Sequence, residues 1–480
     1  MTRPNILWIC TDQQRWDTLG CYGNHFVKTT NLDRLAANGF KFEHCYSQSP
    51  VCTPSRANFL TGRYPRTTRC RQNGQDIPND EILVTKLLAD AGYVCGLSGK
   101  LHLSACHPSA AEEIEPRIDD GYSDFHWSHD PGGGWGLNNE YLKWLKDKGA
   151  VFETPAHSEC DWIREGMPAD LHQTTWCAEK AIDFMKDRGQ DGQSWLFSVN
   201  IFDPHHNFDP PKDLLQRYLK FLDDIPLPNY IEGELNDKPS CQQYDHEGAY
   251  GHDAELAYDK LTEKDHRLIR AAYWAMCDLI DTQVGRMIAA LEETGQLDNT
   301  IIIYHSDHGE MLGDHGIYLK GPYFYEPAIR VPLIISWPGH IKARKSTALV
   351  ELTDLAQTLL DVAGVSHHSG MQGRSLWPML SGKASPDNHR DDIYCEYYNA
   401  MPWHKDPAAQ FTSIRTRSYK IVMDHSANTG ELYDLVQDPS ETRNLWDDAE
   451  AAELKTKMLV RLCNRMAWTV DPLPVRKAGW

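Results

Sequence analysis

Thr300-Ile-Ile-Ile-Tyr304 is the clearest strand pattern in this chain of 480 residues. Its β-branched residues and polar flanks predict a strand that is buried on both faces, as strands of parallel sheets are. The preceding segment, 264–294, carries Leu268, Ala272 and Met276 at helical spacing and predicts a long amphipathic helix. A helix that leads directly into a buried strand is the repeating unit of α/β folds.

The same alternation extends on both sides of this unit. Strand patterns occur at 5–10, 40–46, 93–97, 195–202 and 331–336, and helix patterns occur at 31–38, 55–61, 83–91, 174–187 and 352–363. Two stretches, 105–170 and 203–260, lack a regular period, and we expect them to form long surface loops. We therefore predict an α/β fold in which helices cover both faces of a large, mainly parallel sheet.

The pattern changes near residue 391. Short strand patterns joined by turns occupy 393–398, 411–416, 419–423 and 431–435, and a helix pattern follows at 447–468. This order predicts a small antiparallel sheet with one helix, packed on the main domain. We expect two parts, a catalytic α/β domain at 1–390 and a C-terminal subdomain at 391–480.

The composition excludes some classes of partner. The chain has 48 Lys and Arg residues against 68 Asp and Glu residues, which gives a formal net charge of −20. A nucleic-acid partner is not expected, because it would favour a basic face. An anionic substrate must be attracted by positive charge at the site itself, since the net field of the protein repels it.

No apolar run approaches the roughly 18 residues that would cross a bilayer. Met1-Thr-Arg-Pro leads directly into the first strand pattern without the features of a signal peptide, so we expect a cytoplasmic protein. The thirteen cysteines are scattered without a C-x-x-C pair. We expect most of them to be buried and reduced, and no structural zinc.

Cys52-Thr-Pro-Ser-Arg56 is the segment with the strongest chemical signal. Pro54 suits the first turn of a helix, because its missing N–H is not needed there. Cys52 is therefore expected at a helix N-terminus, where free N–H groups and the helix dipole favour an anion. Arg56 on the same turn could reach back toward that anion. On these five residues alone, a buried cysteine before an ordinary helix is the alternative.

The longer run Cys52-Thr-Pro-Ser-Arg-Ala-Asn-Phe-Leu-Thr-Gly62-Arg-Tyr-Pro65 resembles the signature of the formylglycine-dependent sulfatases of the alkaline-phosphatase superfamily. The resemblance implies an alkaline-phosphatase-like fold and hydrolysis of sulfate monoesters, with a small anionic ester as substrate. It also implies that a formylglycine-generating enzyme oxidises Cys52 to formylglycine, whose hydrated gem-diol supplies the nucleophilic oxygen.

Metal ligands are expected where two strands end. Asp12 and Gln13 follow the first strand, and Asp307 and His308 follow the strand at 300–306. The carboxyl ends of parallel strands meet at one edge of a sheet. The resemblance implies that these four residues bind one divalent cation together with an oxygen on residue 52. Oxygen ligands favour Ca²⁺ or Mg²⁺, and the imidazole also suits Mn²⁺.

Further positive groups follow the order found in sulfatases. Lys100 and His102 lie in a G-K-x-H motif, in which the lysine contacts the sulfate and the histidine holds the second hydroxyl of the nucleophile. His205, after a proline, resembles the histidine on the leaving-group side, although His206 follows it directly. Lys320 resembles the lysine that binds the sulfate and the bridging oxygen.

Three residues leave a second chemistry open. Gln13 and His308 also occur together in the phosphonate monoester hydrolases of the same superfamily, and Asn73 occupies the place of an active-site asparagine in those enzymes. The pair Lys100 and His102 favours sulfate. The alternative function is therefore a phosphonate monoester hydrolase or phosphodiesterase with the same site. A non-catalytic binding protein is disfavoured, because it would have little need for Cys52, Arg56, two aspartate ligands and two lysines together.

The resemblance spans nearly the whole chain. The segments 370–380 and 431–445 resemble runs that recur in the C-terminal part of sulfatases. The natural substrate cannot be derived from the sequence, and a homo-oligomer stays open. Trp127, Trp135 and Trp403 lie in irregular stretches and are candidates for an aromatic wall beside the site.

Overall fold

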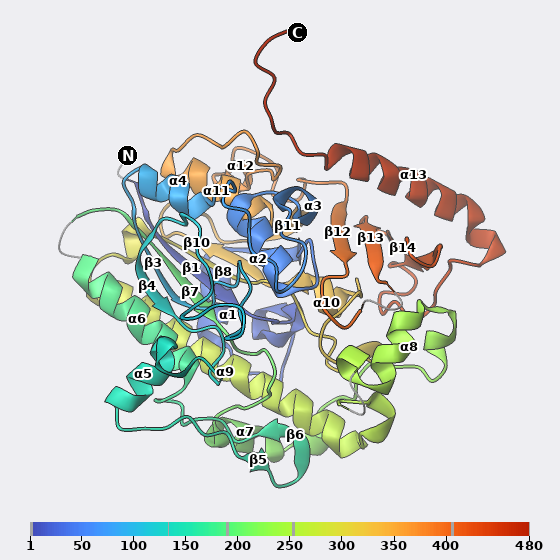
Figure 1. The fold of residues 1–480 in the computed structure, drawn as a ribbon, viewed down its shortest axis with the longest axis horizontal. Coiled ribbons are helices and arrows are strands. Elements are labelled where there is room, and N and C mark those ends of the chain that lie inside the picture. Colours follow the sequence, from blue (N-terminus) through green and yellow to red (C-terminus); the bar gives the residue numbers. More distant parts are fainter. Residues whose placement is uncertain (1–2, 133, 189–191, 252–254, 405–407, 480) are drawn as a thin grey trace.

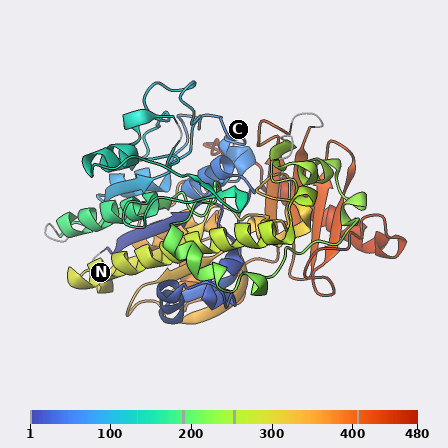
Figure 2. The same ribbon diagram turned by 90° about the horizontal axis from the view of Figure 1, so that it is seen from below.

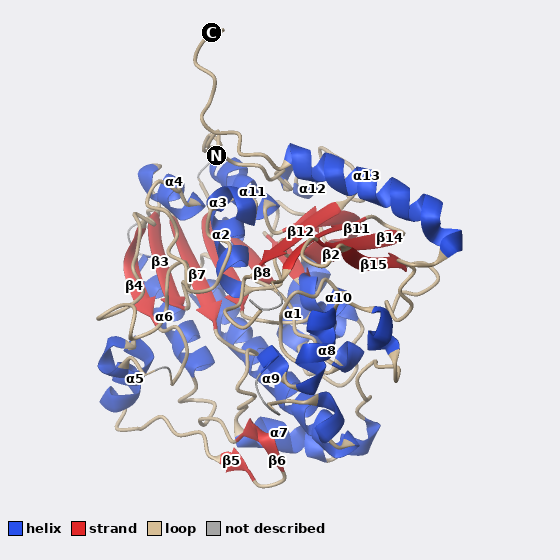
Figure 3. Ribbon diagram, turned by 45° about the vertical axis from the view of Figure 1, so that its right-hand side comes forward, coloured by secondary structure: helices blue, strands red, loops and turns tan. Residues whose placement is uncertain are grey.

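The computed structural model describes the whole chain except residues 1–2, 133, 189–191, 252–254, 405–407 and 480. A large sheet crosses the molecule with helices on both sides, and a smaller sheet lies next to it (Figures 1 and 3). Among the described residues the large sheet has nine strands, in the order β11-β2-β10-β8-β1-β7-β3-β4, and the short β9 pairs with β2. The strands are β1 Asn5–Thr11, β2 Phe40–Tyr46, β3 Val94–Gly99, β4 Tyr122–Trp127, β7 Trp195–Ile201, β8 Thr300–Ser306, β9 Arg330–Val331, β10 Leu333–Ser336 and β11 Arg344–Glu351.

The prediction of a mainly parallel sheet is confirmed. Strands β8, β1, β7, β3 and β4 are parallel neighbours, and β2 is parallel to β11. Only β10 and β9 run antiparallel to their partners among the strands of this sheet that the structure describes. Every residue of β1, β7 and β8 is buried, which explains why their sequences are continuously apolar and do not alternate.

Helices cover both faces of the large sheet. On one face lie α1 (Thr30–Asn38), α6 (Gln173–Arg188) and the long α9 (Glu263–Glu293). On the other face lie α2 (Cys52–Thr61), α4 (Val84–Asp90), α11 (Asp354–Ala363) and the short α12 (Trp377–Leu380). Each face has its own hydrophobic core, so the sheet is the middle layer of three.

The predicted small antiparallel sheet with one helix is also confirmed. It consists of β12 (Ile393–Tyr398), β13 (Gln410–Arg415), β14 (Tyr419–Asp424) and β15 (Thr429–Asp434), all antiparallel. Helix α13 (Ala452–Trp468) packs on β13 and β14, and Figure 2 shows this part standing at one side of the molecule. The domain boundary at 390/391 stays a prediction.

The expectation of long loops at 105–170 and 203–260 is wrong in part. The first stretch contains β4 at the edge of the large sheet, α5 (Glu140–Asp147) and the hairpin of β5 (Ala156–His157) and β6 (Cys160–Arg164). The second contains α7 (Lys212–Leu219) and α8 (Ser240–Glu247). These elements are too short to give a clear period, and β4 is partly exposed because it is an edge strand. Strand β11 was missed because it begins with exposed, charged residues.

All thirteen cysteines are free thiols. None of the helices in the described part of the chain combines the length and the apolar character that crossing a bilayer requires. The remaining short helices are α3 (Pro65–Thr68), beside α2, and α10 (Glu326–Ile329).

Candidate active site

The predicted metal ligands lie at the carboxyl ends of β1 and β8. Thr11 and Ser306 are paired in the sheet, so the residues that follow them, Asp12 and Asp307, emerge side by side. The N–H of Asp307 donates to the carbonyl of Thr11 (3.1 Å), which continues the ladder by one more bond. Gln13 has a φ of 66°, and its N–H donates to Oδ1 of Asp307 (3.0 Å). The two strand ends are therefore fixed to each other.

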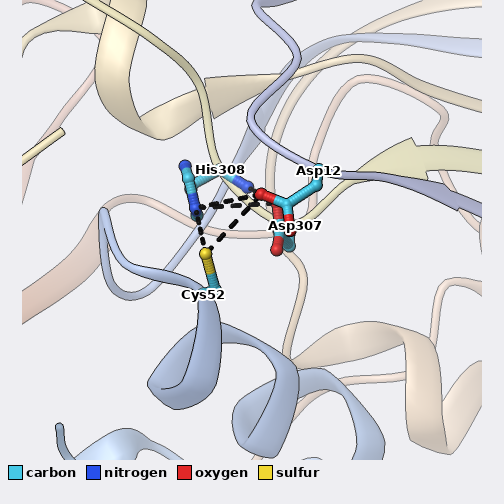
Figure 4. Close-up of side chains that lie close together, drawn as sticks. All are labelled: Asp12, Cys52, Asp307 and His308. Carbon is cyan, nitrogen blue, oxygen red and sulfur yellow. Dashed lines mark hydrogen bonds and ion pairs between the residues drawn. The ribbon is translucent and has the colours of Figure 1, made fainter. Parts of the chain in front are cut away.

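Cys52 approaches these carboxylates from the first turn of α2. Its Sγ lies 3.1 Å from Nε2 of His308 and 3.6 Å from Oδ1 of Asp12. One ligand atom from each of Asp12, Cys52, Asp307 and His308 lies within 4.8 Å of the other three, and all four residues are buried (Figure 4). The expected position of Cys52 at a helix N-terminus is confirmed. Four residues that are distant in the sequence thus form one cluster.

Arg56 neutralises the carboxylates of this cluster. Its Nε lies 2.9 Å from Oδ2 of Asp307, its Nη2 lies 3.3 Å from Oδ2 of Asp12, and its Nη1 donates to the carbonyl of Lys100 (2.8 Å). The side chain is completely buried. The sequence predicts that Arg56 reaches toward an anion at residue 52, whereas in the structure it contacts the two aspartates and the carbonyl of Lys100. Although burial raises the pKa of the Asp12 carboxyl, the charges of Lys100, His205, Lys320 and Arg56 hold it well below its usual range.

Two buried lysines bring positive charge to Cys52. Nζ of Lys320 lies 3.0 Å from Sγ of Cys52, and Nζ of Lys100 lies 3.6 Å from the same atom and 2.5 Å from Oδ2 of Asp12. Burial and the charge of Asp12 raise the pKa of the Cys52 thiol. The positive charges of Lys100, Lys320 and His308 lower this pKa by more, so the net shift is downward. The site therefore favours negative charge at residue 52, against the net charge of the protein.

The two adjacent histidines, His205 and His206, make different contacts in the structure. Nε2 of His205 lies 2.7 Å from Nζ of Lys320, and Nδ1 of His205 lies 2.5 Å from the carbonyl oxygen of His206. That carbonyl only accepts, so Nδ1 carries the proton and Nε2 accepts from Lys320. His206 stacks on His205, with ring centroids 4.1 Å apart, and lies toward Tyr250. His205, not His206, is the histidine that contacts a charged group of the site.

His102 is held by a residue that the sequence did not indicate. Its φ is 54°, and the carboxylate of Glu115 fixes this turn by accepting from the N–H groups of His102 (2.7 Å) and Leu103 (2.9 Å) and from Nε1 of Trp127 (2.9 Å). Burial and the nearby Lys100 hold the pKa of His102 well below its usual range, so its imidazole is neutral. Among the described residues, its buried Nδ1 has no hydrogen-bond partner.

Gln13 and Asn73 also lie at the site. Oε1 of Gln13 accepts a hydrogen bond from Nζ of Lys320 (2.7 Å), and its Nε2 donates to Glu310. Oδ1 of Asn73 accepts from the N–H of Thr53 (3.0 Å), the residue that follows Cys52. The structure thus brings together every residue that the sequence predicted for the site.

Comparison with known proteins gives the family. The sulfatase family model matches residues 4–365, and the model of the C-terminal part of N-sulphoglucosamine sulphohydrolase matches residues 313–467. The chain belongs to the sulfatase family. The first match includes Cys52 and both strand ends, so the cluster described above lies within the part of the chain that defines the family.

Relatives of this sulfatase match it over most of its length. An arylsulfatase of Clostridium perfringens is 30% identical over 463 residues, which cover 94% of this chain and 92% of that protein. An N-acetylglucosamine-6-O-sulfatase of Bacteroides thetaiotaomicron is 30% identical over 497 residues, covering 96% and 85%. The structure of a phosphonate monoester hydrolase of Agrobacterium radiobacter is similar with a TM-score of 0.80, 26% identity and coverage of 98% and 96%. The predicted enzyme class, a sulfuric ester hydrolase, and the alkaline-phosphatase-like fold are confirmed.

A cavity of about 740 Å³ connects the cluster of this sulfatase to the outside. Cys52, Asn73, Lys100, His102, His205 and Lys320 line it, and we call the part around the buried Cys52 its inner end. Of the three tryptophans considered for an aromatic wall, Trp403 lines the cavity. Trp127 and Trp135 do not line it, since they are buried and pack edge to face on each other. His129 and Asp209, which the sequence did not single out, also line the cavity.

Proposed function

We propose that this sulfatase cleaves sulfate monoesters with a nucleophile made from Cys52 by oxidation to formylglycine, and that one divalent cation is bound beside it. A formylglycine-generating enzyme is the partner that this maturation requires, and a small anionic ester is the substrate. The observation that carries the proposal is the convergence at Cys52 of three metal-binding side chains and two lysines. A thiol used only for packing would not be surrounded by so many charged groups.

The side chains around Cys52 fit a divalent cation. Asp12, Asp307 and Gln13 offer oxygen atoms, and His308 offers Nε2, because its Nδ1 lies 2.9 Å from the carbonyl of Gly309 and is oriented by it. This donor set is rich in oxygen, which favours Ca²⁺, while Mg²⁺ and Mn²⁺ suit it as well. When bound, such a cation would stabilise the negative charge of a hydroxyl on residue 52 and of the transferred group.

The residues around the proposed cation have separate roles in the proposed reaction. Hydrated formylglycine offers one hydroxyl for attack on sulfur and a second from which a proton is removed to release sulfate. Lys100 and Lys320, both within 3.6 Å of the Cys52 sulfur, are placed to neutralise the sulfuryl oxygens. Neutral His102 is suited to accept the proton of the second hydroxyl.

Lys320 is our candidate for the acid that protonates the leaving group. His205 accepts a hydrogen bond from Lys320 through Nε2 and has its own proton on the opposite side, toward the carbonyl of His206. The proton nearest the reacting atoms therefore belongs to Lys320. In this arrangement His205 orients the lysine and does not itself donate.

Sulfate is the better supported substrate, and phosphonate is the alternative. Lys100 and His102 are both in place, and the curated relatives described above are sulfatases. The alternative, hydrolysis of phosphonate monoesters, is supported by Gln13, His308 and Asn73 and by the similarity to a phosphonate monoester hydrolase. Both monoesters carry one negative charge near pH 7, so charge alone discriminates weakly between them.

We expect the enzyme to hydrolyse both 4-nitrophenyl sulfate and phenyl phosphonate monoesters. The kcat/KM value should be at least about tenfold higher for the sulfate, or roughly 1.4 kcal/mol of transition-state binding. The double change Lys100→Tyr with His102→Thr should reduce this ratio, because it removes a sulfuryl contact and the proposed base. Steady-state kinetics with both substrates measure the ratio.

The control for this experiment is Lys143→Tyr, which changes an exposed lysine of α5 and should leave the ratio unaltered. A wild-type preference for the phosphonate ester would reverse the assignment of substrate. A ratio that does not respond to the double change would contradict the roles given to Lys100 and His102.

A further inference from the structure

The outer part of the cavity differs in charge from its inner end. Lys100 and Lys320 are the only lysine or arginine side chains among the described residues that line the cavity, and both lie against Cys52. The rest of the described lining contains two carboxyl groups, those of Asp130 and Asp209. The cations are therefore positioned for the sulfuryl group, and the described lining of the outer part offers no lysine or arginine for a second anion.

A chain of rings forms one wall of the same cavity. The ring centroids of Phe202 and His205 are 4.6 Å apart, and His205 stacks on His206. His206 lies 5.9 Å from Tyr250, which stacks on Trp403 at 4.7 Å with an angle of 8° between the planes. All five residues line the cavity. Such a wall suits the flat face of a ring in the substrate.

Asp209 lines this cavity without a side-chain partner among the described residues. The residue is 9% exposed, and the hydrogen bond that its carboxyl group receives comes from its own backbone N–H. The backbone on both sides is fixed, since the carbonyls of Phe208 and Pro210 accept from the N–H groups of Arg164 (2.9 Å) and Gly166 (3.0 Å). The carboxyl group is thus held in place at the cavity wall.

A buried carboxyl group without a side-chain partner costs free energy of folding, because it gives up more hydration than one local hydrogen bond replaces. Burial raises the pKa of Asp209 well above its usual range and the neighbouring Asp203 adds to this shift, although the residue's own N–H and the charge of Arg164 lower it in part. A ligand that brings a hydrogen-bond donor or a positive charge would replace the lost hydration and would favour the ionised form of this carboxyl group. A ligand that brings a second negative charge would meet the carboxyl group of Asp209, and the described lining offers it no lysine or arginine besides Lys100 and Lys320.

We infer that the leaving group of the natural substrate is a ring that carries hydroxyl or ammonium donors and no second negative charge, and that Asp209 accepts a hydrogen bond from it. The inference rests on the proposed sulfatase reaction and concerns the outer part of the same cavity. Asp209 is then a specificity-determining residue: it selects between leaving groups by charge and does not contact the reacting atoms.

Four phenyl sulfates that differ at the 3-position test this inference: the unsubstituted ester and its aminomethyl, hydroxymethyl and carboxy derivatives. In the wild-type enzyme, kcat/KM should be at least about tenfold higher for the aminomethyl than for the carboxy ester. Asp209→Asn, which keeps the shape but removes the charge, should reduce this ratio at least about fivefold. The matched control is Asp213→Asn on the exposed side of α7, which should leave the ratio unaltered.

A carboxy ester that is hydrolysed as well as the aminomethyl ester, or a ratio that Asp209→Asn does not change, would overturn the inference. A melting temperature that falls on the Asp209→Asn change would assign Asp209 a structural role and would also overturn it. Failure of all four esters would contradict the proposed reaction. In that case, calorimetric binding of 3-(aminomethyl)phenol against 3-hydroxybenzoate decides the inference alone, with tighter binding of the amine expected.

Discussion

Replacing Cys52 by serine is expected to lower kcat for sulfate esters by roughly 10⁴- to 10⁶-fold, the range found when a covalent nucleophile is lost. Serine fits the space of the thiol, so Lys100 and Lys320 should keep their positions around residue 52. It has only one hydroxyl group, however, and cannot release sulfate by the collapse that an aldehyde hydrate allows. Steady-state kinetics and a thermal melt of the purified variant measure both effects.

Cys463→Ser is the matched control, because Cys463 is the exposed cysteine on α13 and lies outside the site. It should keep wild-type activity when produced in the same way. Activity of the Cys52→Ser variant within about tenfold of the wild type would contradict the assignment of residue 52 as the nucleophile.

Replacing Asp307 by asparagine is expected to abolish tight binding of the divalent cation and to reduce kcat/KM by more than the roughly 10- to 100-fold that is typical of changes in the second shell of a metal site. The change removes one of the two carboxylates of the cluster. Metal content by mass spectrometry after dialysis, together with kinetics at increasing Ca²⁺, measures the two effects.

The structure explains why asparagine is preferable to alanine at this position. Asp307 is buried and accepts hydrogen bonds from Arg56, from the N–H of Gln13 and from its own neighbour His308. Alanine would remove both the charge and every acceptor atom opposite the buried guanidinium of Arg56, which costs about 3–5 kcal/mol, whereas asparagine keeps one acceptor oxygen there. Wild-type metal stoichiometry in the Asp307→Asn variant would place the cation elsewhere.

The positions of Asp12, Asp307 and Cys52 could be predicted because each follows from a local pattern. Two continuously apolar strands end directly before the aspartates, and parallel strands bring such ends together. Pro54 and the helical pattern after it place Cys52 at a helix N-terminus. These signals depend on a few neighbouring residues and on the direction of the strands.

The partner of Arg56 could not be predicted in this way. Helical spacing places Arg56 on the first turn, but its partners depend on how far the ends of β1 and β8 lie from α2. Glu115 and Asp209 were missed for a related reason. Both lie in stretches without a regular hydrophobic period. The role of Glu115 comes from its hydrogen bonds to another turn, and that of Asp209 comes from its place in the cavity.

Mass spectrometry of the tryptic peptide 42–56 tests the central claim most directly. The peptide contains Cys52 and also Cys45, which is buried in the core and should remain an ordinary thiol. In protein produced together with a formylglycine-generating enzyme, we predict a peptide about 18 Da lighter than the unmodified one, with the aldehyde at residue 52 and only Cys45 open to alkylation. A fully active preparation in which both residues are alkylated as thiols would contradict the account.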